Sequence, residues 1–244
     1  MIRFMASKVR LYVDHPLGVG QSVPLNRDQA HYLFGVMRLA AGDVLSLINS
    51  RDGEWDAVVE KAGNKGGVLA CQAQTRPLQT PTDLWLVFAP IRKERTAFIV
   101  EKAVELGAAR IIPVQTAFTQ AANRIRQDKL QAHSVEASEQ CGGTFVPPVD
   151  DLVKLDRLLA DWPKDRQLMF CDETAIGAPV RLPAIRGPWA ILIGPEGGFS
   201  PAERDKLRAL PFAHAVSLGP RILRADTAAV AALTLWQQAL GDWG

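Results

Sequence analysis

The sequence predicts a small β-rich domain followed by an α/β domain with a mainly parallel sheet. Two observations support this order. Short strand-like runs separated by turn residues fill the first third of the chain, and strand-like runs alternate with helical patterns after it. Between these regions, Pro77 and Pro81 disfavour both a helix and a central strand. We therefore expect one domain over residues 1–77 and a second over residues 78–244.

Within the first domain, β-branched and alternating runs predict five strands, over residues 9–13, 21–25, 44–48, 55–60 and 68–73. The turn residues Asp52 and Gly53 separate two of these strands. One helical stretch is expected over residues 28–37, with Asp28 as its N-terminal cap. This spacing of short strands fits a small β-barrel.

In the second domain, buried apolar runs alternate with amphipathic patterns. Strands are expected over residues 84–89, 110–114, 168–171, 190–193 and 215–218. Helices are expected over residues 93–106, 129–140 and 152–160, from residue 201 onward, and in a last segment that ends near residue 240. Gly107 stands where the first of these helices needs a C-terminal cap. The repeated alternation predicts a sheet with helices on its faces.

The composition is that of an ordinary globular protein. Of the 244 residues, 48% are hydrophobic and 22% are charged, and a net charge of +2 does not by itself indicate nucleic acid. Cys71, Cys141 and Cys171 lack the spacing of a metal or disulfide site, so we expect buried thiols in a reducing compartment and no metal. No run is long and apolar enough for a membrane span or a signal peptide, which predicts a cytoplasmic protein.

A glycine-rich loop over residues 193–198 follows a buried strand of the second domain. Ser200, Pro201 and Glu203 form a capping pattern for the next helix, so the loop lies at the carboxyl end of a parallel strand, where α/β sheets bind ligands. The pattern is neither a P-loop nor a GxGxxG motif, and Glu196 would repel a phosphate. A cationic ligand, or one bound through adenine and ribose, fits better; a plain tight turn is the alternative.

A second loop follows the last strand. Arg221 and Arg224 flank Ile222 and Leu223, an apolar pair that can wall a slot for a purine. The two arginines have the chemistry to hold a phosphate or a base, and ordinary surface roles remain open. Asp226 or Thr227 is the candidate cap for the final helix.

These two segments, over residues 194–203 and 218–228, resemble the cofactor-loop motifs of the RsmE family of ribosomal RNA uridine-N3 methyltransferases. Shorter matches extend the resemblance over nearly the whole chain, at residues 31–43, 101–107, 112–113 and 139–140. The resemblance implies an N-terminal PUA-like β-barrel that binds RNA and a C-terminal SPOUT domain with a trefoil knot. It also implies a homodimer whose active site lies near the subunit interface.

The cofactor implied by the resemblance is S-adenosylmethionine, bent in the knot against both loops. The residues expected to hold it are Ile193, Gly194, Pro195, Glu196, Gly197, Gly198, Leu218, Gly219, Ile222 and Leu223. The implied substrate is one uridine of 16S ribosomal RNA, in the free RNA or the small subunit. RNA contacts are expected from Arg3, Arg10, His31, Arg38, Arg92, Lys93 and Lys102. A solvated face remains the alternative for these side chains, as do a structural hydrogen bond for His31 and an ion pair with Glu105 for Lys102.

Methylation at uridine N3 requires that the N3 proton leave as the methyl group arrives, and that the base leave any stack. We expect Arg224, with Arg221, to stabilise the negative charge that develops on the uracil. Asp226 or Glu196 is expected to orient that arginine or to accept the proton.

The chain departs from the family pattern at three places. Asp226 stands where the family usually has Glu, Ala225 where it has a large polar residue, and residues 141–144 where it tends to carry an Arg. These departures leave room for a SPOUT methyltransferase that acts on another RNA. A non-catalytic RNA-binding assembly factor is the second alternative, although two intact cofactor loops favour an enzyme.

Overall fold

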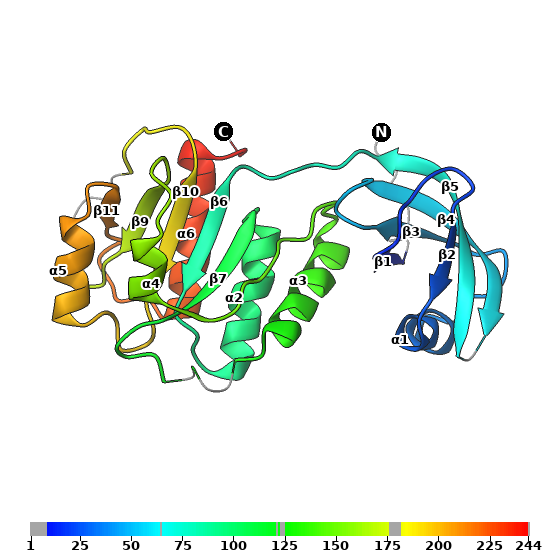
Figure 1. The fold of residues 1–244 in the computed structure, drawn as a ribbon, viewed down its shortest axis with the longest axis horizontal. Coiled ribbons are helices and arrows are strands. Elements are labelled where there is room, and N and C mark those ends of the chain that lie inside the picture. Colours follow the sequence, from blue (N-terminus) through cyan, green and yellow to red (C-terminus); the bar gives the residue numbers. More distant parts are fainter. Residues whose placement is uncertain (1–8, 64, 121, 123–124, 176–181, 244) are drawn as a thin grey trace. The chain divides into compact units, whose positions relative to one another are not determined.

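The computed structural model describes residues 9–63, 65–120, 122, 125–175 and 182–243. The chain divides into two compact units, which are considered separately (Figure 1). The first unit contains Met1–Thr80 and Ser138–Val146, and the second contains Pro81–Ala137 and Pro147–Gly244. Ser138–Val146 therefore groups with the N-terminal part of the chain, which the sequence pattern did not indicate.

The first unit is built on a five-stranded sheet with the order β1-β3-β4-β5-β2. Its strands are β1 (Arg10–Tyr12), β2 (Ser22–Leu25), β3 (Val44–Ile48), β4 (Glu54–Gly63) and β5 (Gly66–Arg76). β1 pairs with β3 in parallel, and the other neighbours are antiparallel. All five predicted strands are confirmed, and the apolar side chains of alternate positions, such as Leu45 and Leu47, are fully buried in its core.

The helical stretch of the first unit differs from the prediction at its start. Helix α1 (Arg27–Ala30) is capped by Asn26 and not by Asp28. The Asn26 side chain accepts a hydrogen bond from the Gln29 backbone N–H, and the Gln29 side chain accepts one from the Asn26 N–H. A π-helical segment, η1 (His31–Val36), continues α1. The reciprocal bonds explain why Asn26 caps the helix.

The second unit contains a six-stranded, wholly parallel sheet with the order β11-β9-β10-β6-β7-β8. The strands are β6 (Leu84–Phe88), β7 (Arg110–Gln115), β8 (Val153–Lys154), β9 (Gln167–Cys171), β10 (Trp189–Ile193) and β11 (Ala213–Val216). The helices are α2 (Lys93–Glu105), α3 (Gln127–Cys141), α4 (Leu155–Ala160), α5 (Pro201–Ala209) and α6 (Ala225–Leu240). The end of α3, from Ser138 onward, groups with the first unit. The predicted α/β class with a mainly parallel sheet is confirmed.

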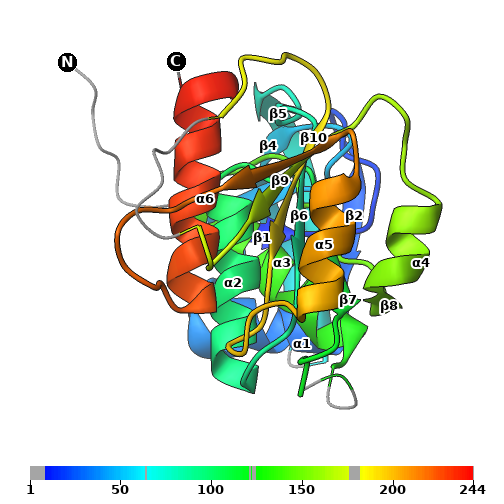
Figure 2. The ribbon, with the colours of Figure 1, turned by 90° about the vertical axis from the view of Figure 1, so that its left-hand side faces the viewer.

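Helices cover both faces of this sheet, with α2 and α6 on one face and α4 and α5 on the other (Figure 2). Alternation along the strands explains the two layers. Leu84, Leu86 and Phe88 pack in the core that includes α2 and α6, whereas Val87 packs with side chains of α4 and α5. Apolar side chains therefore point to both faces of each central strand, as a doubly covered sheet requires.

Several local predictions needed correction. The last strand lies two residues earlier than expected, at Ala213–Val216, and the segment expected as one helix from residue 152 begins with the short strand β8. These ends have little periodicity to define them. Cys71 and Cys171 are buried as predicted, but Cys141 is exposed at the end of α3. The predicted cap at Gly107 is confirmed by its φ of 76°.

Candidate active site

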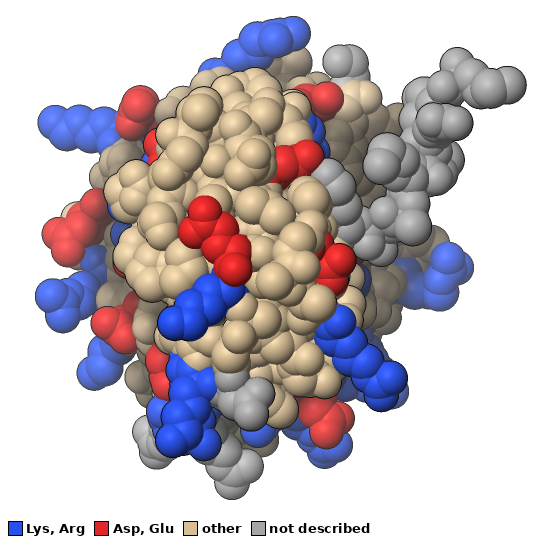
Figure 3. All heavy atoms as spheres, turned by 90° about the vertical axis from the view of Figure 1, so that its right-hand side faces the viewer, with Lys and Arg blue, Asp and Glu red and all other residues tan. Residues whose placement is uncertain are grey.

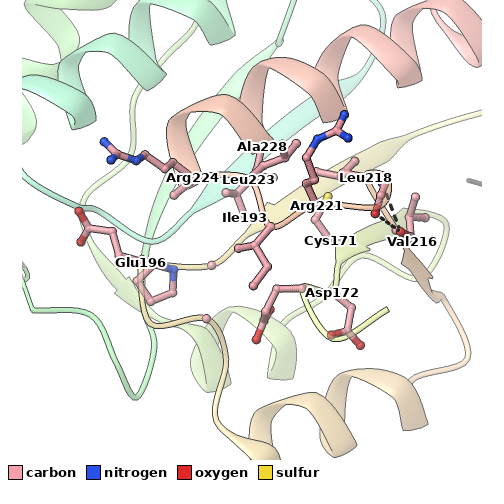
Figure 4. Close-up of a pocket in the computed structure, with 18 residues that line it drawn as sticks. Cys171, Asp172, Ile193, Glu196, Val216, Leu218, Arg221, Leu223, Arg224 and Ala228 are labelled. Carbon is pink, nitrogen blue, oxygen red and sulfur yellow. Dashed lines mark hydrogen bonds between the residues drawn. The ribbon is translucent and has the colours of Figure 1, made fainter. Parts of the chain in front are cut away.

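A pocket in the second unit forms where three segments meet at the carboxyl ends of adjacent parallel strands (Figure 4). The first segment runs from the end of β9 over residues 171–173, and the second runs from the end of β10 over residues 193–198. The third, over residues 216–225, runs from the end of β11 to the start of α6. Strand order explains the meeting, because β11, β9 and β10 are neighbours and all run in the same direction. The two loops singled out in the sequence thus lie on opposite sides of one pocket.

The glycine-rich loop is held by the start of α5. Ser200 and Glu203 make the predicted capping box with Pro201 in the first turn, which confirms that prediction. The Gly198 N–H donates to the Pro195 carbonyl at 2.9 Å and closes a tight turn in which Gly198 has a φ of 69°. Glycine adopts this left-handed conformation without the strain that a side chain would add.

Most of the predicted cofactor residues come together around the pocket. Its lining includes Ile193, Gly194, Pro195, Glu196, Gly198, Leu218, Gly219, Ile222 and Leu223. Gly197 is the exception, because it lies in the loop between two lining residues but does not itself line the pocket. The wall therefore combines backbone groups at glycines with an apolar surface, as expected for a ligand with an aromatic ring and polar groups.

Sequence reasoning missed the third wall of the pocket, Asp172 and Glu173. Glu173 accepts hydrogen bonds from Arg204 at 2.8 Å and from the Phe199 N–H at 3.3 Å. Asp172 accepts from Arg208 and, at 2.7 Å, from the Thr174 hydroxyl. Both arginines lie on α5, so the two carboxylates fix the glycine-rich loop and its helix to the end of β9. The available signal was their position directly after a buried parallel strand.

Burial and hydrogen bonding set the protonation of this wall. Burial by itself would raise the pKa of Asp172, but hydrogen bonds from Thr174 and Arg208 outweigh it and hold that pKa below its usual value. Burial raises the pKa of the neighbouring Cys171 thiol to about 12. The thiol therefore stays protonated near neutral pH and is a poor nucleophile.

The two arginines of the second loop differ from these paired ones. Arg221 and Arg224 are exposed, and neither side chain makes a hydrogen bond or ion pair with another described residue. Figure 4 shows the Arg224 and Glu196 side chains extending to the same side of the pocket, whereas Arg221 extends away from them. Both guanidinium groups are therefore accessible to a ligand that enters from solvent.

Asp226 has a partner other than the expected one. Its carboxylate accepts hydrogen bonds from Arg95 of α2 at 2.7 Å and from the Thr227 N–H at 2.9 Å, and it does not pair with Arg224. It lies inside α6 and not at the N-cap position. Arg224 itself occupies the cap position without a side-chain cap bond. Asp226 lies in the first turn of α6, where its charge also interacts favourably with the helix dipole. The predicted cap is wrong, and the structure gives Asp226 the role of holding Arg95.

The expected RNA contacts fall into three groups. His31, Arg38, Arg92 and Lys93 are exposed. Lys102 pairs with Glu105 at 2.6 Å, and Arg10 is enclosed by acceptors within the first unit. Arg3 lies outside the described residues. On the face of the molecule in Figure 3, acidic and basic side chains are interspersed around an uncharged area, so the described charges there form no continuous basic surface.

Two classes of feature are absent from the part of the chain that the structure describes. Its His, Cys, Asp and Glu side chains form no group of three that could hold a metal ion. Its helices are too short or too polar to cross a membrane.

Comparison with known proteins connects this pocket to RNA methylation. A family model for the RNA methyltransferase domain matches residues 78–237, and one for the RNA methyltransferase PUA domain matches residues 25–70. The ribosomal RNA small subunit methyltransferase E of Mycobacterium bovis is 30% identical over 237 residues, covering 91% of this chain and 88% of that protein.

Solved structures give the same result. The ribosomal RNA small subunit methyltransferase E of Neisseria gonorrhoeae, bound to S-adenosyl methionine, has a TM-score of 0.84 and 27% identity, covering 97% of this chain and 100% of that one. A methyltransferase of Legionella pneumophila in complex with the same cofactor has a TM-score of 0.86 and 28% identity, with the same coverage. These likenesses confirm the predicted fold class, a PUA-like domain followed by a SPOUT domain.

Proposed function

Because this chain belongs to the RsmE family of ribosomal RNA small subunit methyltransferases, we propose that it transfers the methyl group of S-adenosylmethionine to N3 of one uridine in 16S ribosomal RNA. The observation that carries the proposal is the pocket at the carboxyl ends of β9, β10 and β11, where both family loops converge. Relatives with the same architecture hold S-adenosylmethionine.

The lining suits that cofactor in charge and shape. Leu218, Ile222 and Leu223 offer an apolar surface for adenine, and Gly194 and Gly198 let polar groups approach the backbone. Glu196 contributes negative charge at the pocket edge, which favours a cationic ligand over a phosphate. When bound, the cofactor supplies a methyl group already activated by its sulfonium.

The chain's own residues must then make uracil N3 nucleophilic. We assign the N3 proton to the Glu196 carboxylate, which lies at the exposed edge of the pocket. As the N3 lone pair forms its bond to the methyl carbon, the carbon–sulfur bond breaks and its electrons stay on sulfur. Arg224 stabilises the negative charge on the uracil carbonyls, and Arg221 offers a second guanidinium for the RNA.

The remaining parts of the chain have supporting roles in this proposal. The N-terminal domain, over residues 1–77, binds the ribosomal RNA, and the domain over residues 78–244 carries out the transfer. His31, Arg38, Arg92 and Lys93 are the accessible cations among the expected contacts. We further propose a homodimer with the site near the subunit interface; light scattering of the purified protein tests the dimer.

Nucleoside mass spectrometry tests the reaction and the substrate together. Ribosomal RNA is digested from cells with the gene, without it, and with the gene restored. Loss of 3-methyluridine from small-subunit RNA alone, and its return on restoration, is the expected result. Unchanged 3-methyluridine in the absence of the gene would overturn the assignment. Loss of a different methylated nucleoside would instead indicate a SPOUT enzyme with another RNA site.

A further inference from the structure

The loop that follows β7 presents an exposed aromatic side chain beside the glycine-rich loop. Phe118 is 46% exposed, although it lies next to the pocket and not on a distant surface. We propose that Phe118 is a stacking platform for an unpaired base that flanks the target uridine. This inference rests on the proposed function and names one of its RNA contacts.

The turn that carries Phe118 is held by hydrogen bonds on both sides. The Thr116 N–H donates to the Thr119 hydroxyl at 2.9 Å, and the Thr119 N–H donates back to the Thr116 carbonyl at 3.2 Å. The Ala117 N–H donates to Oε1 of Glu203 at 2.7 Å. A side chain at the tip of such a fixed turn loses little further freedom when it binds a ligand.

Glu203 ties this turn to the cofactor loop. Its Oε2 accepts from the Ser200 N–H at 2.8 Å in the capping box, while its Oε1 accepts from Ala117. One carboxylate therefore holds both the start of α5 and the Phe118 turn. The position of Phe118 relative to the glycine-rich loop is set by the same bonds that shape that loop.

The ring lies on the outer side of the glycine-rich loop. A Cβ atom added at Gly197 would meet the Cβ of Phe118 at 3.4 Å and atoms of its ring at 3.7 Å. Glu196 and Gly198, on either side of Gly197, line the pocket, whereas Gly197 does not. Phe118 is thus separated from the pocket by the thickness of one backbone segment. A base entering the pocket is the target, and a base on Phe118 is one of its neighbours.

The surroundings favour RNA as the partner. Arg92 and Lys93 are exposed and follow β6, which is the parallel neighbour of β7, so they lie at the same edge of the sheet as the Phe118 turn. Arg224 is exposed at the pocket itself. Exposed aromatic rings among basic side chains are the usual platform for single-stranded nucleic acid, because every base can stack on a ring. Contacts to flanking nucleotides also fix which base enters a modifying enzyme's pocket.

The test compares Phe118→Ala, Phe118→Leu and Phe118→Tyr. Leucine keeps apolar bulk without a flat ring, and tyrosine keeps the ring. The matched control is Trp243→Ala, because Trp243 is 52% exposed but lies beyond the C-terminal end of α6. The pocket is at the other end of this 16-residue helix, roughly 24 Å away. Each variant is assayed for tritiated methyl transfer to small ribosomal subunits from cells that lack the gene.

Loss of a stacked base predicts that KM for the subunits rises about tenfold in Phe118→Ala and Phe118→Leu. Phe118→Tyr and Trp243→Ala stay within about twofold of wild type, as do kcat and the affinity for S-adenosylmethionine in every variant. An unchanged KM in Phe118→Ala overturns the inference. A changed oligomeric mass of Phe118→Ala also overturns it, because Phe118 would then contact another protein chain. A loss of affinity for S-adenosylmethionine as large as the rise in KM overturns it too, because Phe118 would then support the glycine-rich loop.

A second readout separates this inference from the proposed function. Binding of a short fluorescent oligouridylate is measured for the same variants without any methyl transfer. If the wild type methylates no subunits but Phe118→Ala weakens oligouridylate binding, the proposed function fails and the stacking role stands. If the variant and the wild type bind this probe equally, the stacking role fails whatever the methylation assay shows.

Discussion

Arg10 and Arg224 are both singled out in the sequence, Arg10 for RNA contact and Arg224 for catalysis. The structure uses them differently. The five N–H groups of Arg10 donate to the Glu54 carboxylate and to the carbonyls of Ser138, Glu139 and Gly143, and its side chain is 13% exposed. Arg224 is exposed and makes no such bond to another described residue.

The difference shows what separates an arginine that supports the fold from one that can meet a ligand. Glu54 is buried, so its charge must be compensated, and Arg10 and Arg76 both pair with it. Burial opposes ionisation of Glu54, but hydrogen bonds from Arg76 and Arg10 outweigh burial and hold its pKa below the usual value. Arg224 has no buried carboxylate beside it, so its donors remain available to a substrate.

Removing Glu54 should have the largest effect on stability. Glu54→Ala leaves Arg10 partly buried without its counterion, and breaking such a pair costs about 3–5 kcal/mol. Urea unfolding followed by circular dichroism measures the loss. Glu60→Ala serves as the control, because Glu60 is exposed on the same strand, β4. If both variants lose the same amount, the Arg10 network contributes no more than a surface charge.

The same pair predicts a dependence on pH. Because the pKa of Glu54 is lowered on folding, its stabilising effect is present above the unfolded value of about 4.5 and is lost as the pH falls through the folded value. The difference in unfolding free energy between wild type and Glu54→Gln should therefore be constant near neutral pH and shrink in acid. A difference that grows in acid would contradict the lowered pKa.

Arg224→Ala tests whether the exposed arginine of the pocket acts in catalysis. Removing the group that stabilises a developing negative charge should lower kcat by roughly 10²–10³-fold. The affinity for S-adenosylmethionine, measured by calorimetry, should change little, since the guanidinium extends out of the pocket. Arg186→Ala is the control, because Arg186 is also exposed but precedes β10, at the opposite end of that strand. Full activity of Arg224→Ala would show that an exposed arginine at the pocket need not be catalytic.

Gly198→Ala tests the glycine-rich loop, and we expect an effect smaller than that of Arg224→Ala. An added Cβ would collide with the Glu173 carboxylate, and the φ of 69° is strained for alanine. We expect the affinity for S-adenosylmethionine to fall by about tenfold, from a strain of one to two kcal/mol. Gly187→Ala is a matched control, since Gly187 also has a positive φ, of 124°, but an added Cβ has nothing within 4 Å. Equal affinities in both variants would show that the collision does not disturb the pocket.

Local patterns predicted what local chemistry determines. Alternating runs identified the strands of the first unit, continuous apolar runs identified those of the second except β8, and the Ser200–Glu203 capping box fixed the start of α5. The pocket loops followed because parallel strands end at one edge. These local patterns could not predict contacts between residues that are far apart in the sequence. Arg10 meets Gly143, and Asp226 meets Arg95, through contacts that no periodicity encodes. Short elements such as β8 were missed for the same reason, because tertiary pairing alone defines them.

Substitution of Asp226 should have the smallest effect on activity. It tests whether this carboxylate only holds Arg95 or also acts in catalysis. Its partner Arg95 is partly exposed, and ion pairs of this kind contribute about 0–1 kcal/mol. Asp226→Ala should therefore lower kcat/KM by at most about fivefold, and Asp226→Glu, which keeps the charge, should restore most of it. Initial rates of methyl transfer to small subunits measure both. If Asp226→Ala instead matches the loss in Arg224→Ala, then Asp226 acts on Arg224 or on the N3 proton during the reaction, and its ion pair with Arg95 is not the contact that matters in catalysis.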